Sequence, residues 1–400
     1  MKIAVVGAGT IGVSTAYELA VDGHEVTVFE RRSAVAEEAS FSHAGMLGPG
    51  YVAPWSGPIQ TGLRLSLAEI GWGRQRKRLA EPARVQALHA ALQQLAHASR
   101  DRRQQLEAAL QLGGDRCNGL MLLFRTEADS QQAQPRLQAL REAGTLVQDL
   151  TPAIARKLEL ALNQDTQFFG AAYLQHDEVG NGRQFALVLK AAAQEMGVRF
   201  QMNTPVAKLQ KSEPTMLQIG GKPSPEKFDA VVVCAGAAAD DLLRPAGVKL
   251  PLAAVYGHAL NAQIREPLNA PRSAVMDERH KVCISCVGHR VRVSGGADMG
   301  LSAKDQAGAI QLLYKVLHDW FPGAAKVSAD VQEWRAAMPL LPDGAPVIGA
   351  SGVPGVWLNL GHGANGAALA CGSARSVADM VAGRPPALDA GALGAGRFTA

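Results

Sequence analysis

Residues 2–12 read KIAVVGAGTIG, and this stretch decides the fold of the amino-terminal part of the chain. The apolar run at 2–6 predicts a buried strand, and the segment from Gly7 to Gly12 predicts a turn after it. Residues Val13 to Asp22 are then expected to form a helix and Glu25 to Glu30 a second strand. A strand, a helix and a strand in this order form one βαβ unit, which indicates an α/β domain built on a parallel sheet.

The turn fits the pattern G-x-G-x-x-G, with a glycine at each position where the backbone needs one. Gly7 permits the tight turn, Gly9 allows a pyrophosphate to approach the backbone, and Gly12 allows the helix to pack closely on the strand. The amides of the turn, including that of Ile11, and the helix N-terminus offer a site for an anion. Glu30 ends the second strand, where a carboxylate can accept hydrogen bonds from a ribose. The sequence therefore predicts a dinucleotide-binding, Rossmann-like domain.

A second glycine loop near the carboxyl terminus favours FAD over NAD as the dinucleotide. It lies between an expected strand at Val356–Leu360 and an expected helix at Ala367–Val381. Such a loop adds further amides and a positive helix end, which suit the electron-rich end of a reduced flavin. A simple NAD dehydrogenase has no need of it. The residues of this loop are Gly361, His362, Gly363, Ala364, Asn365 and Gly366.

The bulk composition is that of an ordinary globular protein. The 400 residues are 47% hydrophobic and 19% charged, which allows a large core and two or three domains. A net charge of +4 against 40 basic and 36 acidic residues gives no strong electrostatic case for a nucleic-acid partner. No apolar run approaches the roughly 18 residues of a membrane-spanning helix, and an odd number of cysteines suits a reducing compartment. We expect a cytoplasmic protein with at most peripheral membrane contact.

The pattern along the chain predicts two domains that interrupt each other. A long ordered loop is expected from Glu38 to Gly62, and helical spacing from Ala83 to Leu112 begins an inserted region that runs to about Ala172. Alternation at Pro251 to Ile264 and Lys281 to Ser294 is typical of the antiparallel strands of a substrate-binding sheet. The expected FAD-binding domain comprises 1–80, 173–250 and 335–400, and the expected α+β substrate-binding domain comprises 81–172 and 251–334.

At these motifs the chain resembles the bacterial FAD-dependent D-amino acid dehydrogenases, within the glycine oxidase and D-amino acid oxidase superfamily. The similarity spans almost the whole chain, although it is loose at about 70–170. The matching segments are GAGTIGVSTAYELAVDGHEVTVFE at 7–30, SFSHAGMLGPGYVAPW at 40–55, residues 177–200, DAVVVCAG at 229–236, RVRVSGG at 290–296, PDGAPVIG at 342–349 and residues 361–386. The resemblance implies that the flavin is held by Gly7, Gly9, Gly12, Glu30, Arg31, Ser40, Ala44, Gly45, Val206, Ala235, Gly236, Gly363 and Gly366.

The resemblance also implies an activity and leaves alternatives to it. The implied reaction is oxidation of the Cα–N bond of a D-amino acid, with hydride passed to flavin N5 and electrons passed on to a quinone or a partner protein. Such chemistry needs position more than an acid–base dyad. The alternatives are a D-proline or D-hydroxyproline dehydrogenase, a true oxidase that uses oxygen, and an FAD-binding subunit of a larger complex with little activity alone.

Two departures from the family pattern bear on the substrate site. Where the family has an arginine before Pro-Asp-Gly, this chain has Met338, and where it has a tyrosine in a Lys-Gly-Tyr-Ser-like segment, this chain has His258. A cation that binds a carboxylate or faces the flavin is therefore expected elsewhere. Met338 is also the feature that favours a subunit without catalysis.

Candidate substrate residues come from the loops and the sheet. Tyr51, in a Pro-Gly turn, can present its hydroxyl to a substrate, while His43 and His362 lie in the loops nearest the expected flavin. Arg290 and Arg292 share one face of a strand, and we expect Arg292 to clamp the substrate's carboxylate. His258 is a further candidate for the catalytic site.

Two further patterns are interpreted as structural. Cys283 and Cys286 lie on an expected strand, where they face opposite sides, so core packing is favoured over a metal or redox site. No metal site is predicted. The basic residues Arg74, Arg76, Lys77 and Arg78, with Arg100, Arg102 and Arg103, favour a solvated helix face over contact with an anionic membrane.

Overall fold

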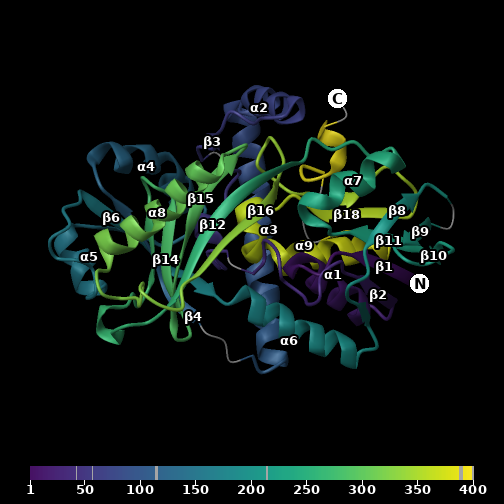
Figure 1. The fold of residues 1–400 in the computed structure, drawn as a ribbon, viewed down its shortest axis with the longest axis horizontal. Helices are drawn as coiled ribbons and strands as arrows, with labels where there is room; N and C mark the ends of the chain where they lie inside the picture. Colours follow the sequence, from purple (N-terminus) through teal and green to yellow (C-terminus); the bar gives the residue numbers. More distant parts are fainter. Residues whose placement is uncertain (42, 56, 113–115, 213–214, 387–390, 399–400) are drawn as a thin grey trace.

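The computed structural model describes residues 1–400 except 42, 56, 113–115, 213–214, 387–390 and 399–400. Its strands form two large sheets and one small sheet, with helices packed on their faces (Figure 1). One half of the molecule holds both termini and a mostly parallel sheet, and the other half holds a long, mainly antiparallel sheet. The expected fold class, a Rossmann-like domain with an α+β domain on an antiparallel sheet, is confirmed.

The first sheet has six strands in the order β17-β18-β11-β1-β2-β7, parallel except for the β17–β18 pair. The strands that meet at its centre are almost wholly buried, because helices cover one face and the small sheet approaches the other. The strands are β1 (Lys2–Val6), β2 (Glu25–Phe29), β7 (Arg199–Gln201), β11 (Ala230–Val233), β17 (Val347–Ala350) and β18 (Val356–Leu360).

Three helices pack on one face of this sheet and bury its core. Helix α1 (Thr10–Val21) begins three residues before the expected start at Val13. The reason is that Gly9 lies in an extended conformation as the N-cap, and Gly12 is already inside the helix. The other two are α6 (Gly182–Glu195) and α9 (Gly366–Val381).

The small antiparallel sheet lies near the opposite face of the first sheet, with helix α7 (Ala239–Leu243). Leu209, Leu217 and Phe228 of its strands join the same apolar cluster as the first sheet. Its strands are β8 (Val206–Gln210), β9 (Thr215–Ile219) and β10 (Glu226–Phe228).

The second large sheet follows the order β16-β12-β15-β14-β13-β4-β6-β5, with β3 paired to β15. The expected run from Lys281 to Ser294 is a hairpin, because Gly288 turns at a φ of 60° between β14 and β15. The strands are β3 (Gln60–Thr61), β4 (Arg116–Phe124), β5 (Val147–Leu150), β6 (Gly170–Gly180), β12 (Ala253–Gln263), β13 (Ala274–Asp277), β14 (Val282–Val287), β15 (Arg290–Met299) and β16 (Gln332–Leu340).

Helices α8 (Ala303–Trp320) and α4 (Glu127–Glu142) cover opposite faces of the second sheet. Val291 and Val293 of β15 pack with α8, whereas Met276 and Cys283 belong to the cluster beneath α4. The short helix α5 (Pro152–Leu158) contributes Ala155 to the α8 side.

The packing does not follow the expected domain boundaries at 81, 173 and 335. Helix α3 (Pro82–Ala109) buries Leu92 and Leu95 against α9 of the first half. Strand β6 spans residue 173 and β16 spans residue 335, both within the second sheet. Helix α2 (Leu67–Leu79) lies at the top of the view, with Trp72 buried against the second sheet (Figure 1). No described helix is long and apolar enough to cross a membrane.

Candidate functional site

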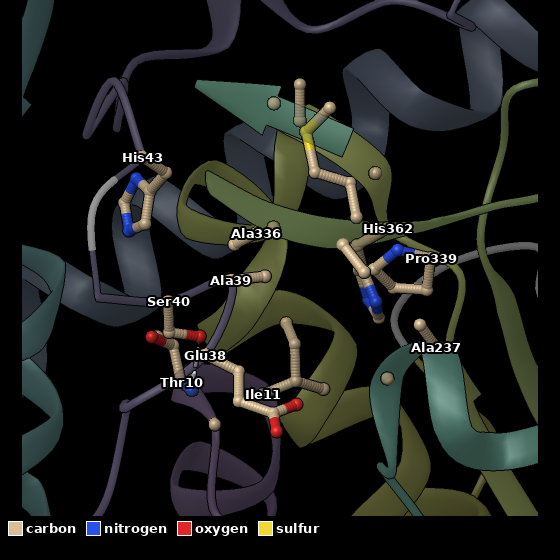
Figure 2. A pocket seen from close by; sticks show the side chains of 18 of the residues that line it. Thr10, Ile11, Glu38, Ala39, Ser40, His43, Ala237, Ala336, Pro339 and His362 are labelled. Atoms are coloured by element: carbon tan, nitrogen blue, oxygen red, sulfur yellow. Dashed lines mark hydrogen bonds between the residues drawn. The ribbon is translucent and has the colours of Figure 1, made fainter. Parts of the chain in front are cut away.

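A cavity of about 500 Å³ runs between the two halves of the molecule and is lined by residues from both. Residues near the start of α1, the loop after β18 and strand β16 converge on it, as Figure 2 shows for Thr10, His362 and Ala336. The segment after β2 lines it as well, with Ser40 and His43 facing the same space. One end of the cavity therefore lies at the glycine turn and the other at the antiparallel sheet.

The glycine turn is shaped as a backbone cradle. Gly7 has a φ of 101°, and a Cβ atom there would lie 2.6 Å from the carbonyl oxygen of Cys234. A Cβ at Gly12 would lie 1.9 Å from the carbonyl oxygen of Gly7, so helix and strand could not approach as they do. At Gly9 a Cβ would lie 3.2 Å from Ser40 Oγ. Side chains at Gly7 and Gly12 would therefore clash with the backbone that shapes the turn, and one at Gly9 would crowd Ser40.

Glu30 lies at the end of β2, beside the turn. Its Oε2 accepts a hydrogen bond from the Ala8 amide at 2.7 Å, and its Oε1 accepts one from the Arg32 amide at 2.8 Å. These bonds fix the carboxylate at the cavity wall, where its remaining lone pairs can accept from a ribose. Arg31, which also lines the cavity, donates to Glu38 at 2.6 Å.

The second glycine loop closes over the same cavity. Gly361 and Gly363 have φ values of 82° and 54°, which L side chains rarely adopt. The side chain of Asn365 donates to the Ala53 carbonyl at 2.8 Å and so ties this loop to the segment before Trp55. His362 is buried, and burial lowers its pKa to about 3, so its ring is neutral.

The residues present fit FAD. The cavity extends from the glycine turn past Glu30 to the second glycine loop, which is the path of an extended dinucleotide. Thr10 Oγ1 and His362 Nε2 are buried without a hydrogen-bond partner in the described structure, so both can bond to a ligand. The expected flavin residues that line the cavity are Gly7, Gly9, Ile11, Glu30, Arg31, Ser40, Ala44, Val206, Ala235, Gly236, Gly361, Gly363, Ala364, Asn365 and Gly366.

Two expected flavin residues are not among the described residues that line the cavity. Gly12 lies behind the turn, where it contacts the Gly7 carbonyl. Gly45 has a φ of 75°, and a Cβ there would lie 2.4 Å from the carbonyl oxygen of Gly180. Both glycines therefore shape the wall from outside it.

At the other end of the cavity, Tyr51 is held by a rigid turn. It ends a short 3-10 helix, η1 (Pro49–Tyr51). The side chain of Gln93, on α3, donates to the carbonyls of Pro49 and Val52 at 2.9 and 2.6 Å. Asp177, on β6, accepts from the Gly50 amide at 3.1 Å. Tyr51 is among the residues that line the cavity.

The two arginines of β15 lie differently from the expectation of a shared pocket wall. Arg290 bonds to Asp330 and to the carbonyl of Asn261, because it sits at the outer end of the strand. Arg292 is 7% exposed and lies behind His43, to whose carbonyl it donates at 3.5 Å. Neither arginine is among the described residues that line the cavity, whereas Ser294 on the same strand is.

Two histidines of the site, His43 and His258, are engaged with protein groups. His43 Nδ1 accepts from the Gly45 amide at 2.8 Å, and burial together with the charge of Arg292 lowers its pKa to about 4. His258 contributes to the wall, and its Nε2 lies 2.5 Å from Asp298 Oδ2. Asp298 also accepts from Arg335 at 2.7 Å, so this imidazole is anchored on β12.

Met338 also lines the cavity, next to Gly257. Its thioether stands where the family pattern has an arginine, so the wall carries no charge at that position.

Several residues at the Tyr51 end were not predicted from the sequence. Arg136, from α4, and Lys281, from the turn between β13 and β14, both line the cavity. Glu278 pairs with both of them, at 3.1 and 2.5 Å. Arg136 lies in the region of loose family similarity and belongs to no motif. Only the packing of α4 on the sheet shows that it reaches the cavity.

The remaining patterns have structural roles. Cys283 lies in the cluster beneath α4 and Cys286 packs toward α8, so the two thiols face opposite sides of β14. The described residues contain no group of three or more side chains that could hold a metal ion. Arg102 and Arg103 are engaged in ion pairs with Glu18 and Glu178 respectively, rather than exposed to solvent as a free basic face.

The comparisons with known proteins identify the family of the chain. The family model of FAD-dependent oxidoreductases matches residues 2–380. A D-amino acid dehydrogenase of Cereibacter sphaeroides is 34% identical over 420 residues, which cover 100% of this chain and 96% of that protein. Glycine oxidase from Geobacillus kaustophilus has the same fold, with a TM-score of 0.75 and 24% identity over 98% of this chain and 97% of that one.

A further structure of the same fold contains the cofactor. It is that of L-alpha-glycerophosphate oxidase from Mycoplasma pneumoniae with FAD bound, with a TM-score of 0.71 and 18% identity, covering 95% of this chain and 94% of that one. From the family match over almost its whole length and the cradle at 7–12, the chain belongs to the FAD-dependent oxidoreductases.

Proposed function

We propose that the chain oxidises a D-amino acid at its Cα–N bond, yielding an imino acid that water hydrolyses to a 2-oxo acid and ammonia. The observation that carries this proposal is the single cavity, which continues from the nucleotide cradle into a chamber on the antiparallel sheet. When FAD is bound, its ring accepts a hydride from the substrate carbon. The similarity to D-amino acid dehydrogenases of two Cereibacter sphaeroides strains supports the choice of substrate.

The residues of the chamber position such a substrate rather than supply a strong acid or base. Met46, Met276 and Met338 give apolar walls that exclude water from the reacting carbon. His43 and His362 carry no charge at neutral pH, because their pKa values are lowered to about 4 and about 3. No positive charge from these rings then opposes the charge that develops on the substrate nitrogen as the hydride leaves.

Anaerobic reduction of the flavin tests this function directly. Purified holoenzyme is mixed under argon with a panel of D-amino acids, their L-enantiomers, D-proline and D-hydroxyproline, and the flavin absorbance is followed. We expect bleaching by at least one primary D-amino acid and none by its enantiomer. Bleaching by D-proline or D-hydroxyproline alone would replace the proposed substrate with a cyclic amine.

A flavin that stays oxidised with the whole panel would support the alternative suggested by Met338. In that case the chain binds FAD as a subunit of a larger complex, and the neutral thioether at the cavity wall reflects a site that has lost its substrate.

We propose a quinone as electron acceptor, reached through peripheral contact of α2 with an anionic membrane. Leu67, the first residue of this helix, and Leu63, which precedes the helix, are 88% and 105% exposed; the last turn carries Arg76, Lys77 and Arg78, of which Arg76 donates to the Gly57 carbonyl. A segment with exposed leucines at one end and basic residues at the other suits the headgroup region of an anionic bilayer. Co-sedimentation with phosphatidylglycerol vesicles, lost in L63S/L67S and absent with phosphatidylcholine, is the expected result. Equal sedimentation of the variant and the wild type would exclude this surface.

The acceptor itself is tested by reoxidation. Reduced enzyme should be reoxidised faster by a soluble quinone analogue than by air-saturated buffer. The opposite order would indicate an oxidase.

A further inference from the structure

The end of the cavity away from the glycine turn holds a cluster of charged groups that the family motifs do not include. Arg136 and Lys281 line the cavity there together with Tyr51. The guanidinium of Arg136 lies 4.6 Å from the centroid of the Tyr51 ring. Its Nη2 donates to Glu278 Oε1 at 3.1 Å, and the side chain is 21% exposed. Stacking and ion pairing thus hold the guanidinium in one orientation.

The cluster has more positive than negative charge toward the cavity. Glu278 is 4% exposed and pairs with both cations, and it is not among the described lining residues. Burial alone would raise the pKa of Glu278, but the charges of Arg136 and Lys281 outweigh it and lower the pKa. The carboxylate therefore stays ionised between its two cations, and of these three groups the two cations are the ones that line the cavity.

Arg136 also has donor capacity that the protein does not use. Its Nε is buried and has no hydrogen-bond partner within the described residues. Because the side chain lines the cavity and is 21% exposed, its guanidinium can meet a planar oxyanion there. A carboxylate is the group of an amino acid with this shape and charge.

Two other arginines near the chamber, Arg292 and Arg335, also have a buried Nε without a partner in the described structure, but neither is among the described residues that line the cavity. Arg292 lies behind His43 and donates to its carbonyl, and Arg335 is paired with Asp298. At the position of the family arginine the wall carries Met338. Of the described residues that line the substrate half of the cavity, Arg136 and Lys281 carry the fixed positive charge.

We propose that Arg136 binds the α-carboxylate of the substrate, with the Tyr51 hydroxyl and Lys281 completing the site. This inference rests on the proposed function in taking the substrate to be an amino acid. The guanidinium is pre-organised by Tyr51 and Glu278, so binding costs little ordering of the side chain. The site takes a monocarboxylate whose remaining part contacts the apolar wall of Met276 and Cys283.

The test uses a carboxylate probe that needs no turnover. Oxidised holoenzyme is titrated with benzoate and with its neutral isostere benzamide, and the shift of the flavin absorbance gives the Kd. We expect wild type to bind benzoate at least tenfold more tightly than benzamide. Arg136→Gln should raise the benzoate Kd at least tenfold and leave the benzamide Kd unchanged. Arg136→Lys should lie between them, because it keeps the charge and loses the fork.

Controls separate the charge of Arg136 from its structural role. Arg125→Gln removes an arginine that pairs with Asp277 and Asp319 away from the cavity lining, and it should leave the benzoate Kd unchanged. Arg136→Gln also leaves Glu278 with Lys281 as its remaining ion-pair partner, so the double variant R136Q/E278Q is measured as well. The double variant should bind benzoate weakly, as R136Q does, and should keep the wild-type FAD content.

Two outcomes would overturn the proposal. One is a wild-type benzoate Kd in both R136Q and R136Q/E278Q. The other is that Arg292→Gln loses benzoate binding while R136Q keeps it, which would return the role to Arg292. If no amino acid reduces the flavin but benzoate binding still depends on Arg136, the proposed function fails while the carboxylate site stands. If D-amino acids reduce R136Q with a wild-type half-saturation concentration, the site fails while the function stands.

Discussion

Replacing Asp177 by asparagine should stabilise the protein at high pH and less so at low pH. Asp177 is 4% exposed on β6, and it holds the turn that presents Tyr51. Burial raises its pKa from 3.8 to about 6, and the neighbouring charge of Glu178 adds to the increase. Hydrogen bonds from the backbone of Gly50 and Tyr51 act in the opposite direction but are outweighed. At neutral pH the folded protein therefore holds a carboxylate that its surroundings disfavour.

The sign and size of the effect follow from linkage. Because the folded pKa is above the unfolded value, the folded state binds more protons between pH 3.8 and about 6, so stability falls as pH rises through this window. A shift of roughly two units corresponds to about 3 kcal/mol, of which about 1.4 kcal/mol falls between pH 5 and pH 8. Asparagine keeps an acceptor for the Gly50 amide and has no such titration.

Urea unfolding at pH 8 and at pH 5 measures the effect. The stability of Asp177→Asn relative to wild type should be higher at pH 8 than at pH 5 by about 1.4 kcal/mol. Any cost of the new amide group is the same at both pH values and cancels in this difference. The exposed Asp149, on neighbouring β5, provides the control variant Asp149→Asn. A difference between the two pH values no larger than that of the control would refute the reasoning.

Three further predictions concern the cofactor site. Glu30→Ala should raise the Kd for FAD about 10- to 150-fold, since one charge-assisted hydrogen bond is worth about 1.5–3 kcal/mol; equilibrium dialysis measures it, and a change matching that of exposed Glu25→Ala would contradict the ribose role. Gly12→Ala should yield protein with little flavin and a lower Tm, because its Cβ meets the Gly7 carbonyl at 1.9 Å, whereas Gly71→Ala, with no atom within 4 Å, should keep full FAD content. The folded pKa of His43, about 4, lies below its unfolded value of 6.5. The free energy of unfolding should therefore fall as the pH falls from 6.5 to about 4, because the unfolded state takes up the proton first. His43→Gln should reduce that loss in urea unfolding, and an unchanged pH profile would show that His43 does not titrate as inferred.

The cofactor half of the site could be predicted from the sequence because local rules determine it. A glycine turn between a strand and a helix, and a carboxylate at the end of the next strand, are positioned by consecutive residues of one βαβ unit. The helix start was misplaced by three residues, because Gly12 reads as part of the turn although it is helical. The boundary at 81 was placed by composition, which does not reveal that α3 packs on α9.

The substrate half depends on pairing between distant segments, and local pattern gives only part of it. Alternation on β15 shows that Arg292 and Val293 face opposite sides, and the structure agrees. Alternation does not show which side of the sheet meets the cavity, nor that Arg292 is shielded from it by His43. That depends on the segment around residue 43, which comes from the other half of the chain.

The same reasoning explains why the carboxylate-binding cation escapes a motif search. Strand β13 pairs in parallel with β4, from a distant part of the chain, and this pairing puts the turn with Glu278 and Lys281 beside α4. Arg136 then reaches the cavity from a helix that follows β4, although neither segment belongs to the family motifs. A methionine at position 338 removes a cation from one wall, and Arg136 supplies one at another. Substrate recognition in this chain is therefore carried by the packing of α4 on the sheet, which is the part of the molecule that a family pattern describes least.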